Sequence, residues 1–204
     1  MFDGKNTSKN LIPYDGEAYY IENFLEEKLA IQFFKDLHEK ISWEHDEFLI
    51  YGKKIITKRK VAWYGSKAFD YNYSQITRKA KPWTKSLINL KQLIENESKD
   101  QFNSCLLNLY PEGSDGMGWH SDDEKELRPL ATIASLSLGS DRKFSFKHRT
   151  SKETISLTLN NGSLLLMKGE IQKHWRHQLP KTQKEVDPRI NLTFRSIIDH
   201  AAVI

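Results

Sequence analysis

The sequence predicts an α+β fold in which helices pack against one face of a β core. The chain has 204 residues, 38% of them hydrophobic and 28% charged, which is ordinary for a single globular domain. Its first hundred residues contain two stretches with helical periodicity, whereas the second half contains short β-like runs separated by Gly, Asn and Pro. Because the helices precede the strands, we expect them on one side of a sandwich or barrel.

Two helices are expected from the spacing of apolar residues. Over residues 22–41, Leu and Phe recur every four positions, which predicts a helix with one apolar stripe. A second helix should open at Pro82, since proline is favoured in the first helical turn, and should end within residues 96–100. Residues 1–20 look irregular.

The segment between these helices, residues 43–81, is rich in both aromatic and basic residues. Strand-like pieces at 48–51, 55–58 and 60–64 suggest hairpins that cover one end of the core. A functional interpretation is a surface on which rings stack on nucleobases and lysines contact phosphates. The density of aromatic rings beside positive charges favours the nucleic-acid-binding surface over hairpins that only cover the core.

The second half predicts a β core built from many short strands. The expected strands are residues 104–110, 131–138, 143–147, 154–159, 163–168, 174–179 and 190–197.

Composition limits the compartment and the partners. No apolar run approaches the roughly 20 residues that span a bilayer, and the first 20 residues lack a secretory signal. The single cysteine, Cys105, excludes an internal disulfide, so we expect a cytoplasmic protein with no membrane partner. No dimer seam is evident, and a monomer is expected. The net charge of +4 is a mild excess, but the lysines and arginines gather in local clusters.

A histidine and a carboxylate two residues apart suggest a metal site. His120 and Asp122 follow a Gly-rich turn at residues 113–118, and side chains at i and i+2 of an extended segment point to the same side. A downstream histidine would complete the two-His, one-carboxylate triad of non-haem Fe(II) oxygenases. Spacing does not choose between His174 and His177, which are three residues apart.

Period-2 patterns mark two further candidate strands. Asn108 and Tyr110 share one face of the first β run. Near the C-terminus, Arg189, Asn191, Thr193 and Arg195 share one face, and three apolar residues share the other. If the polar face points inward, its arginines need counter-ions; otherwise this face is solvent-exposed.

Four blocks in this order resemble the AlkB family. They are Asn-Leu-Tyr at 108–110, Trp-His-Ser-Asp-Asp-Glu at 119–124, His-Trp-Arg-His-Gln-Leu-Pro at 174–180 and Pro-Arg-Ile-Asn-Leu-Thr-Phe-Arg at 188–195. Members of this family are Fe(II)- and 2-oxoglutarate-dependent dioxygenases that repair alkylated nucleobases. The resemblance covers about residues 44–198 and is strongest to the branch that acts on double-stranded DNA.

The resemblance implies a double-stranded β-helix, or jelly-roll, core with an N-terminal nucleotide-recognition lid. We therefore expect one domain, 1–204, with helices and lid in 1–100 and the catalytic core in 101–204. It implies His177 as the third ligand of Fe(II) beside His120 and Asp122. It also implies O2 as the oxidant and 2-oxoglutarate as the co-substrate. The residues expected to hold 2-oxoglutarate are Asn108, Tyr110, Arg189, Asn191 and Arg195.

The resemblance also implies a reaction and a substrate. Expected is oxidative demethylation of 1-methyladenine and 3-methylcytosine in DNA with release of formaldehyde, near a bacterial nucleoid or in a eukaryotic nucleus. The alternatives are the same chemistry on RNA, and a silent β-barrel that only binds nucleic acid. Loop 181–184 is less basic than the family's phosphate clamp, so duplex and single strands both remain open. The implied substrate contacts are Trp63, Tyr71, Tyr73, Ser74, Glu124 and Tyr51.

Overall fold

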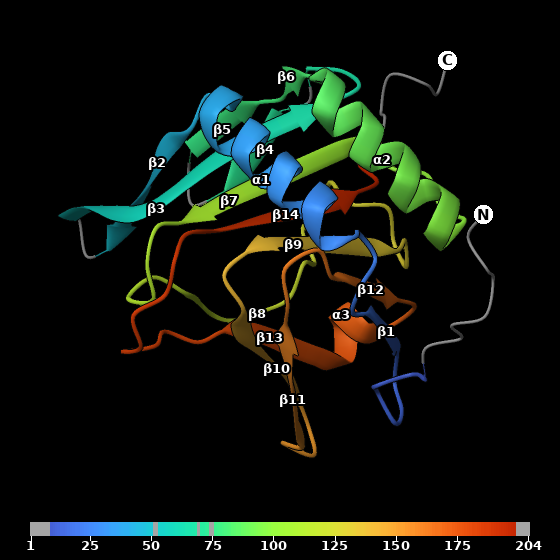
Figure 1. Ribbon diagram of the computed structural model, residues 1–204. Coiled ribbons are helices and arrows are strands. Elements are labelled where there is room, and N and C mark those ends of the chain that lie inside the picture. The colour runs from blue at the N-terminus through green and yellow to red at the C-terminus, as the bar shows by residue number, and fades with distance from the viewer. Residues whose placement is uncertain (1–8, 51–52, 69, 74–75, 199–204) are drawn as a thin grey trace.

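The protein consists of two β-sheets that face each other and two long helices on the outer face of the larger sheet (Figure 1). This computed structural model describes residues 9–50, 53–68, 70–73 and 76–198. The expected α+β class with helices on one face is confirmed.

The helices are α1, Glu27–Lys40, and α2, Lys85–Ser98. Pro82 does not open α2, because the Thr84 side chain caps it by accepting a hydrogen bond from the backbone N–H of Leu87. Pro82 instead lies in a two-residue strand, β6 (Lys81–Pro82), which pairs with β3. The prediction that a helix begins near Pro82 was therefore right about the region and wrong about the role of the proline.

The larger sheet has the order β1-β12-β9-β14-β7-β3-β2, with β6 alongside β3. It combines strands from both halves of the chain, so the boundary near residue 100 does not separate two sheets. Its strands are β1 Glu17–Ile21, β2 Glu44–Ile50, β3 Lys53–Gly65, β7 Ser104–Tyr110, β9 Ile133–Gly139, β12 Leu164–Lys168 and β14 Arg189–Arg195.

The smaller sheet has the order β11-β10-β13-β8. Its strands are β8 Met117–His120, β10 Arg142–His148, β11 Thr154–Leu159 and β13 Trp175–Leu179. Strands β7 to β14 are thus divided equally between two four-stranded layers, β12-β9-β14-β7 and β11-β10-β13-β8. This is the jelly-roll core expected from the sequence. A separate hairpin is formed by β4, Asp70–Tyr73, and β5, Ile76–Lys79.

Both faces of β14 are buried, so its alternating polar residues point into the protein and not to solvent. Ile190, Leu192 and Phe194 pack in the core between the larger sheet and the helices, as do buried leucines of α1 and α2. The opposite face, which carries the two arginines, looks toward the smaller sheet. Arg189 and Arg195 are 1% and 4% exposed, so the solvent-facing interpretation of this strand is wrong.

Three local expectations were also wrong. Residues 17–21 form β1, because Tyr20 and its neighbours pair with β12 from the far end of the sequence. The three strand-like pieces within 48–64 belong to only two long strands, β2 and β3. His174 ends a short helix, α3 (Ile171–His174), and the strand begins at Trp175.

Within the described ranges, no helix has the length and apolar character that crossing a membrane requires.

Candidate active site

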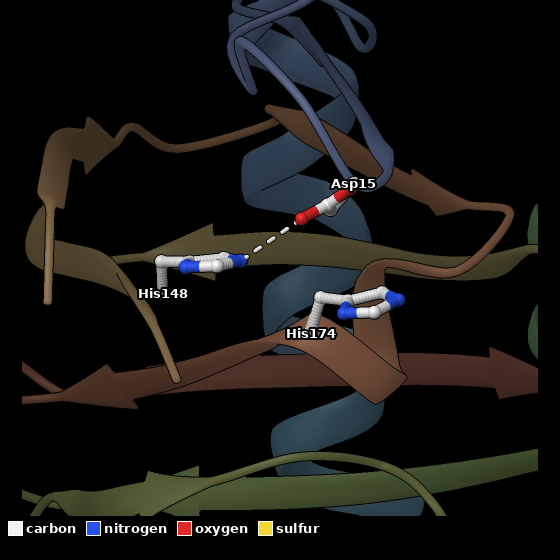
Figure 2. Close-up of side chains that lie close together, drawn as sticks. All are labelled: Asp15, His148 and His174. Atoms are coloured by element: carbon white, nitrogen blue, oxygen red, sulfur yellow. Dashed lines mark hydrogen bonds and ion pairs between the residues drawn. The ribbon is translucent and has the colours of Figure 1, made fainter. Parts of the chain in front are cut away.

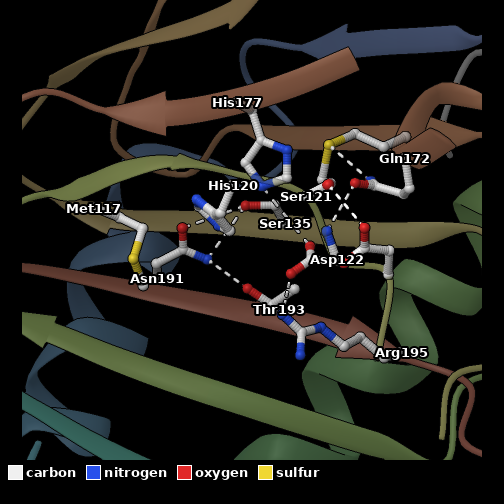
Figure 3. A network of polar contacts seen from close by, with 12 residues as sticks. Met117, His120, Ser121, Asp122, Ser135, Gln172, His177, Asn191, Thr193 and Arg195 are labelled. Atoms are coloured by element: carbon white, nitrogen blue, oxygen red, sulfur yellow. Dashed lines mark hydrogen bonds and ion pairs between the residues drawn. The ribbon is translucent and has the colours of Figure 1, made fainter. Parts of the chain in front are cut away.

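His120, Asp122 and His177 converge between the two sheets (Figure 3). One ligand atom from each lies within 4.8 Å of the others. His120 ends β8, Asp122 follows two residues later, and His177 lies directly opposite His120 in the β8–β13 pairing. The imidazole rings are 4.2 Å apart between centroids and inclined by 66°, so their planes cross. The structure therefore brings the three expected metal ligands together.

The hydrogen bonding of His120 prepares it to bind a metal. Its Nδ1 lies 2.8 Å from the carbonyl oxygen of Gly118. A carbonyl only accepts, so Nδ1 carries the proton and Nε2 presents its lone pair. His177 is suited in another way: burial, then repulsion from His120 whenever that ring is protonated and from Arg195, holds the pKa of its imidazole well below the usual 6.5. His177 is therefore neutral at physiological pH, as a ligand must be.

Arg195 orients the carboxylate of Asp122. Its Nη2 donates to Asp122 Oδ1 at 2.5 Å, and its Nη1 lies 3.5 Å from Glu124 Oε1. The other carboxylate oxygen, Oδ2, lies 3.8 Å from His177 Nε2. Since the guanidinium occupies one oxygen, the second is left to face the histidines. Asp122 and Glu124 therefore supply the counter-ions that Arg195 of the C-terminal strand was expected to need.

Gln172 and Arg149 support this loop, and the sequence alone did not identify them. Gln172, on α3, accepts a hydrogen bond from the backbone N–H of Asp122 at 3.0 Å. Arg149 donates to the Ser121 hydroxyl and lies 3.5 Å from Asp123. Both contacts join segments 26 to 50 residues apart, so no local pattern predicts them.

Gly116 lets the loop before β8 approach β13. A Cβ at this position would lie 2.4 Å from the carbonyl oxygen of Leu179. A larger residue would push β8, and with it His120, away from His177. The Gly-rich turn is thus a packing requirement of the site.

A cavity of about 220 Å³ extends from the three ligands between the sheets. Glu124 and Arg195 are among the residues that line it, and Leu106, Val61 and Met117 form apolar parts of its wall. The expected 2-oxoglutarate contacts Asn108, Tyr110 and Asn191 also line it.

Arg189 does not itself line the cavity, but it contacts residues that do. It contacts Asn191, whose Oδ1 accepts from Nη2 at 3.0 Å, and the Tyr110 ring, 5.6 Å from the guanidinium carbon. Its Nη2 also donates to Ser137 Oγ at 2.9 Å, whereas Nε and Nη1 are buried and have no hydrogen-bond partner among the described residues. Burial lowers the pKa of Arg189 to about 10.

Comparison with known proteins places this geometry in a family. The model of the 2OG-Fe(II) oxygenase superfamily matches residues 17–195. The human protein named DNA oxidative demethylase ALKBH2 is 35% identical over 191 residues, which are 90% of this chain and 70% of that one. The chain belongs to the AlkB family of 2OG-Fe(II) oxygenases. It is therefore a dioxygenase that uses Fe(II), 2-oxoglutarate and O2, as the sequence predicted.

Two further comparisons agree with this AlkB assignment. The bovine alpha-ketoglutarate-dependent dioxygenase alkB homolog 3 is 36% identical over 184 residues, 85% of this chain and 64% of that one. A solved structure titled "The structure of OsALKBH1" superposes with a TM-score of 0.64 at 15% identity, covering 88% of this chain and 96% of that chain. At that identity the match supports the fold alone.

The residues of this AlkB-family chain fit both groups that the family implies. Two neutral imidazoles and one carboxylate oxygen are the donor set of a non-haem Fe(II) site. Arg189 is a buried cation with two unpaired N–H groups, and no carboxylate of the described residues pairs with it. A carboxylate of 2-oxoglutarate would satisfy that cation by a charge-assisted pair.

The substrate residues implied for an AlkB protein are placed less uniformly. Glu124 lines the cavity. Trp63 is buried behind the wall, where it packs with Ala80 and Ile197. Tyr71 and Tyr73 belong to β4, but their side chains lie outside the described part of the structure. Tyr51 and Ser74 lie outside the described residues altogether.

A second His–His–Asp cluster lies at the C-terminal end of β10, where His148 is the last residue of the strand (Figure 2). Asp15, on the loop before β1, lies 3.2 Å from His148 Nε2, and His174 completes the cluster. The His148 and His174 rings are almost parallel, inclined by 13° with centroids 6.3 Å apart. Trp175 also donates its ring N–H to the Tyr14 carbonyl oxygen at 3.0 Å, so this cluster fastens the N-terminal segment to the smaller sheet.

Proposed function

We propose that this chain demethylates N-alkylated bases in DNA by Fe(II)- and 2-oxoglutarate-dependent hydroxylation. The substrates are 1-methyladenine and 3-methylcytosine, and the reaction is direct-reversal repair. The observation that carries the proposal is the cavity in which His120, Asp122 and His177 lie beside Glu124, with Arg189 behind the wall. Relatives at 35% identity are named DNA oxidative demethylases, which supports DNA as the partner.

His120, Asp122 and His177 would hold iron on one side and leave its other positions open. Arg189 would pair with the far carboxylate of 2-oxoglutarate, with Tyr110 beside it. Bound iron supplies an oxidation with O2 in which 2-oxoglutarate becomes succinate and CO2 and a methyl C–H becomes C–OH. The hydroxymethyl group then leaves the base nitrogen as formaldehyde.

Glu124 would select the substrate by its charge. Both methylated bases are cationic, and the Glu124 carboxylate lines the cavity that receives them. The apolar wall formed by Leu106, Val61 and Met117 excludes water from the reacting methyl group. The base must leave its stack to reach this depth, which is easiest for a damaged or unpaired base.

Mass spectrometry of an oligonucleotide with a single 1-methyladenine tests this function. We expect the loss of one methylene mass, dependent on both Fe(II) and 2-oxoglutarate, and formaldehyde in equal amount. The Asp122→Ala variant should leave the oligonucleotide unchanged. Retention of the methyl group by every substrate under these conditions would refute demethylation.

The same assay on duplex DNA, single-stranded DNA and RNA separates the remaining alternatives. Faster turnover of RNA than of either DNA form would replace DNA by RNA as the substrate. A silent binding protein would consume no 2-oxoglutarate, and its His120→Ala variant would bind DNA normally.

The co-substrate role of Arg189 has a test of its own. Arg189→Leu removes a buried cation together with its unpaired N–H groups, so the apo protein should be at least as stable as the wild type. Its KM for 2-oxoglutarate should rise by a factor of about 30 or more, which corresponds to losing a charge-assisted hydrogen bond of roughly 2 kcal/mol. An unchanged KM would assign the carboxylate to another group.

A further inference from the structure

The outer face of the smaller sheet is cationic and contains no acidic side chain. Phe144, Phe146 and Trp175 of this sheet pack inward in the core between the sheets. Alternation therefore sends Lys143 and Lys147 of β10 outward, together with the residues that pair with them. None of the four strands of the smaller sheet carries Asp or Glu.

Two of these cations face each other directly. Lys147 and Arg176 are opposite in the antiparallel pairing of β10 with β13. Like charges directly opposite on neighbouring strands destabilise a sheet. Within the described residues, no carboxylate pairs with either side chain, nor with Lys143. Both Lys143 and Arg176 are exposed. The face thus keeps a repulsion that a polyanion would relieve.

An aromatic ring adjoins these charges. Trp119, on β8, is half-buried, and Lys147 Nζ lies 5.8 Å from the centroid of its ring. Trp119 directly precedes His120, which lines the cavity. The face therefore begins at the edge of the candidate active site. A ring beside lysine and arginine is the combination with which proteins contact single strands.

We propose that this basic sheet face, defined as Trp119, Lys143, Lys147 and Arg176, binds the phosphates of the substrate strand beyond the nucleotide in the cavity. The proposal rests on the proposed function, because it takes that nucleic acid as its ligand. The exposed neighbours on β11 are Thr154, Ser156 and Thr158, whose hydroxyls also donate to phosphate oxygens. A membrane surface fits less well, because it requires apolar side chains to insert.

Salt-dependent binding of a long, unmodified single-stranded oligonucleotide tests the face. The double variant Lys147→Gln/Arg176→Gln is compared with Lys28→Gln/Lys35→Gln, which removes two exposed charges from α1 beyond the larger sheet. Fluorescence anisotropy should show roughly tenfold weaker binding by the sheet variant, with a slope against log salt that is smaller by about 1.4. The α1 variant should keep the wild-type slope.

Turnover gives a second, independent measurement. On a methylated mononucleotide, which has no phosphates of neighbouring nucleotides, the sheet variant should match the wild type. On a long methylated strand, its KM should rise with kcat unchanged. Its melting temperature should not fall, since a like-charge pair is removed, so weaker binding cannot be ascribed to unfolding.

Several outcomes would overturn the proposal. Two concern the variants: an equal loss of affinity in the sheet and α1 variants, or a wild-type salt slope in the sheet variant. Absence of DNA binding by the wild type would also overturn it. So would a sheet variant that binds DNA normally but no longer binds anionic vesicles. If the wild type binds DNA through this face but demethylates no oligonucleotide, the proposed function fails and the face stands. If demethylation proceeds and the variants behave alike, only the face fails.

Discussion

Two clusters in this molecule each contain two histidines and one aspartate, yet their hydrogen bonds prepare them for different roles. In the active site, His120 Nδ1 meets the carbonyl oxygen of Gly118. In the N-terminal cluster, His148 Nδ1 meets the backbone N–H of Ser151 at 3.0 Å. An N–H only donates, so Nδ1 of His148 carries no proton, and Nε2–H donates to Asp15. In this arrangement Nε2 of His148 carries a proton and has no free lone pair for a metal.

Ring orientation adds to this difference. The His120 and His177 planes cross at 66°, whereas those of His148 and His174 are inclined by only 13°. The comparison teaches that a metal site is specified by the backbone group behind each histidine as much as by the histidines themselves.

The largest expected contrast is between His120→Ala and His148→Ala. Removing a ligand should lower turnover at least about a hundredfold, since loss even of an outer-shell partner costs 10–100-fold. His148→Ala should keep wild-type turnover. Succinate release with a methylated oligonucleotide measures both. A comparable loss in His148→Ala would show that the second cluster also serves the reaction.

Gln172→Leu should weaken Fe(II) binding by about 10-fold. The substitution leaves the backbone N–H of Asp122 without its acceptor, so the carboxylate is held less firmly. Titration with Co(II) in the presence of 2-oxoglutarate measures the affinity, with the exposed neighbour Lys173→Leu as a control. Recovery in Gln172→Asn would not be expected, because the shorter side chain cannot reach. Equal affinities in the wild type, Gln172→Leu and Lys173→Leu would contradict this role.

His148→Ala should instead lower the free energy of unfolding by about 1–3 kcal/mol. It removes the acceptor for Ser151 and the donor to Asp15, which together tie the N-terminal segment to β10. Urea unfolding of the iron-free protein measures the change. Wild-type stability combined with reduced metal content in this variant would reverse the roles given to the two clusters.

The smallest expected effect is the pH dependence due to His177. Its folded-state pKa is depressed, so below about pH 6.5 the unfolded chain takes up a proton that the folded chain excludes. Stability of the iron-free protein should thus fall as pH drops from about 6.5, by up to roughly 1.4 kcal/mol per pH unit from this group. Unfolding by urea at several pH values, compared with His177→Gln, isolates the contribution. An identical slope in His177→Gln would assign it elsewhere.

Much of the site could be predicted from local sequence. The i and i+2 spacing of His120 with Asp122, and of Arg189 with Asn191, is preserved by extended backbone, which places each pair on one side. The strand at residues 104–110 was predicted with its observed bounds. By contrast, spacing left His174 and His177 equivalent. The resemblance favoured His177, and the structure places it opposite His120.

The sequence by itself determined the fold class, the family and the residue types at the centre, because these follow from periodicity and short motifs. Only the tertiary structure decided that both faces of β14 are buried, that Gln172 holds Asp122, and that no carboxylate of the described residues pairs with the basic sheet face. These depend on contacts between residues far apart in the chain. A side chain's hydrogen-bond partner, and hence the proton on each imidazole, is fixed only when distant segments pack together.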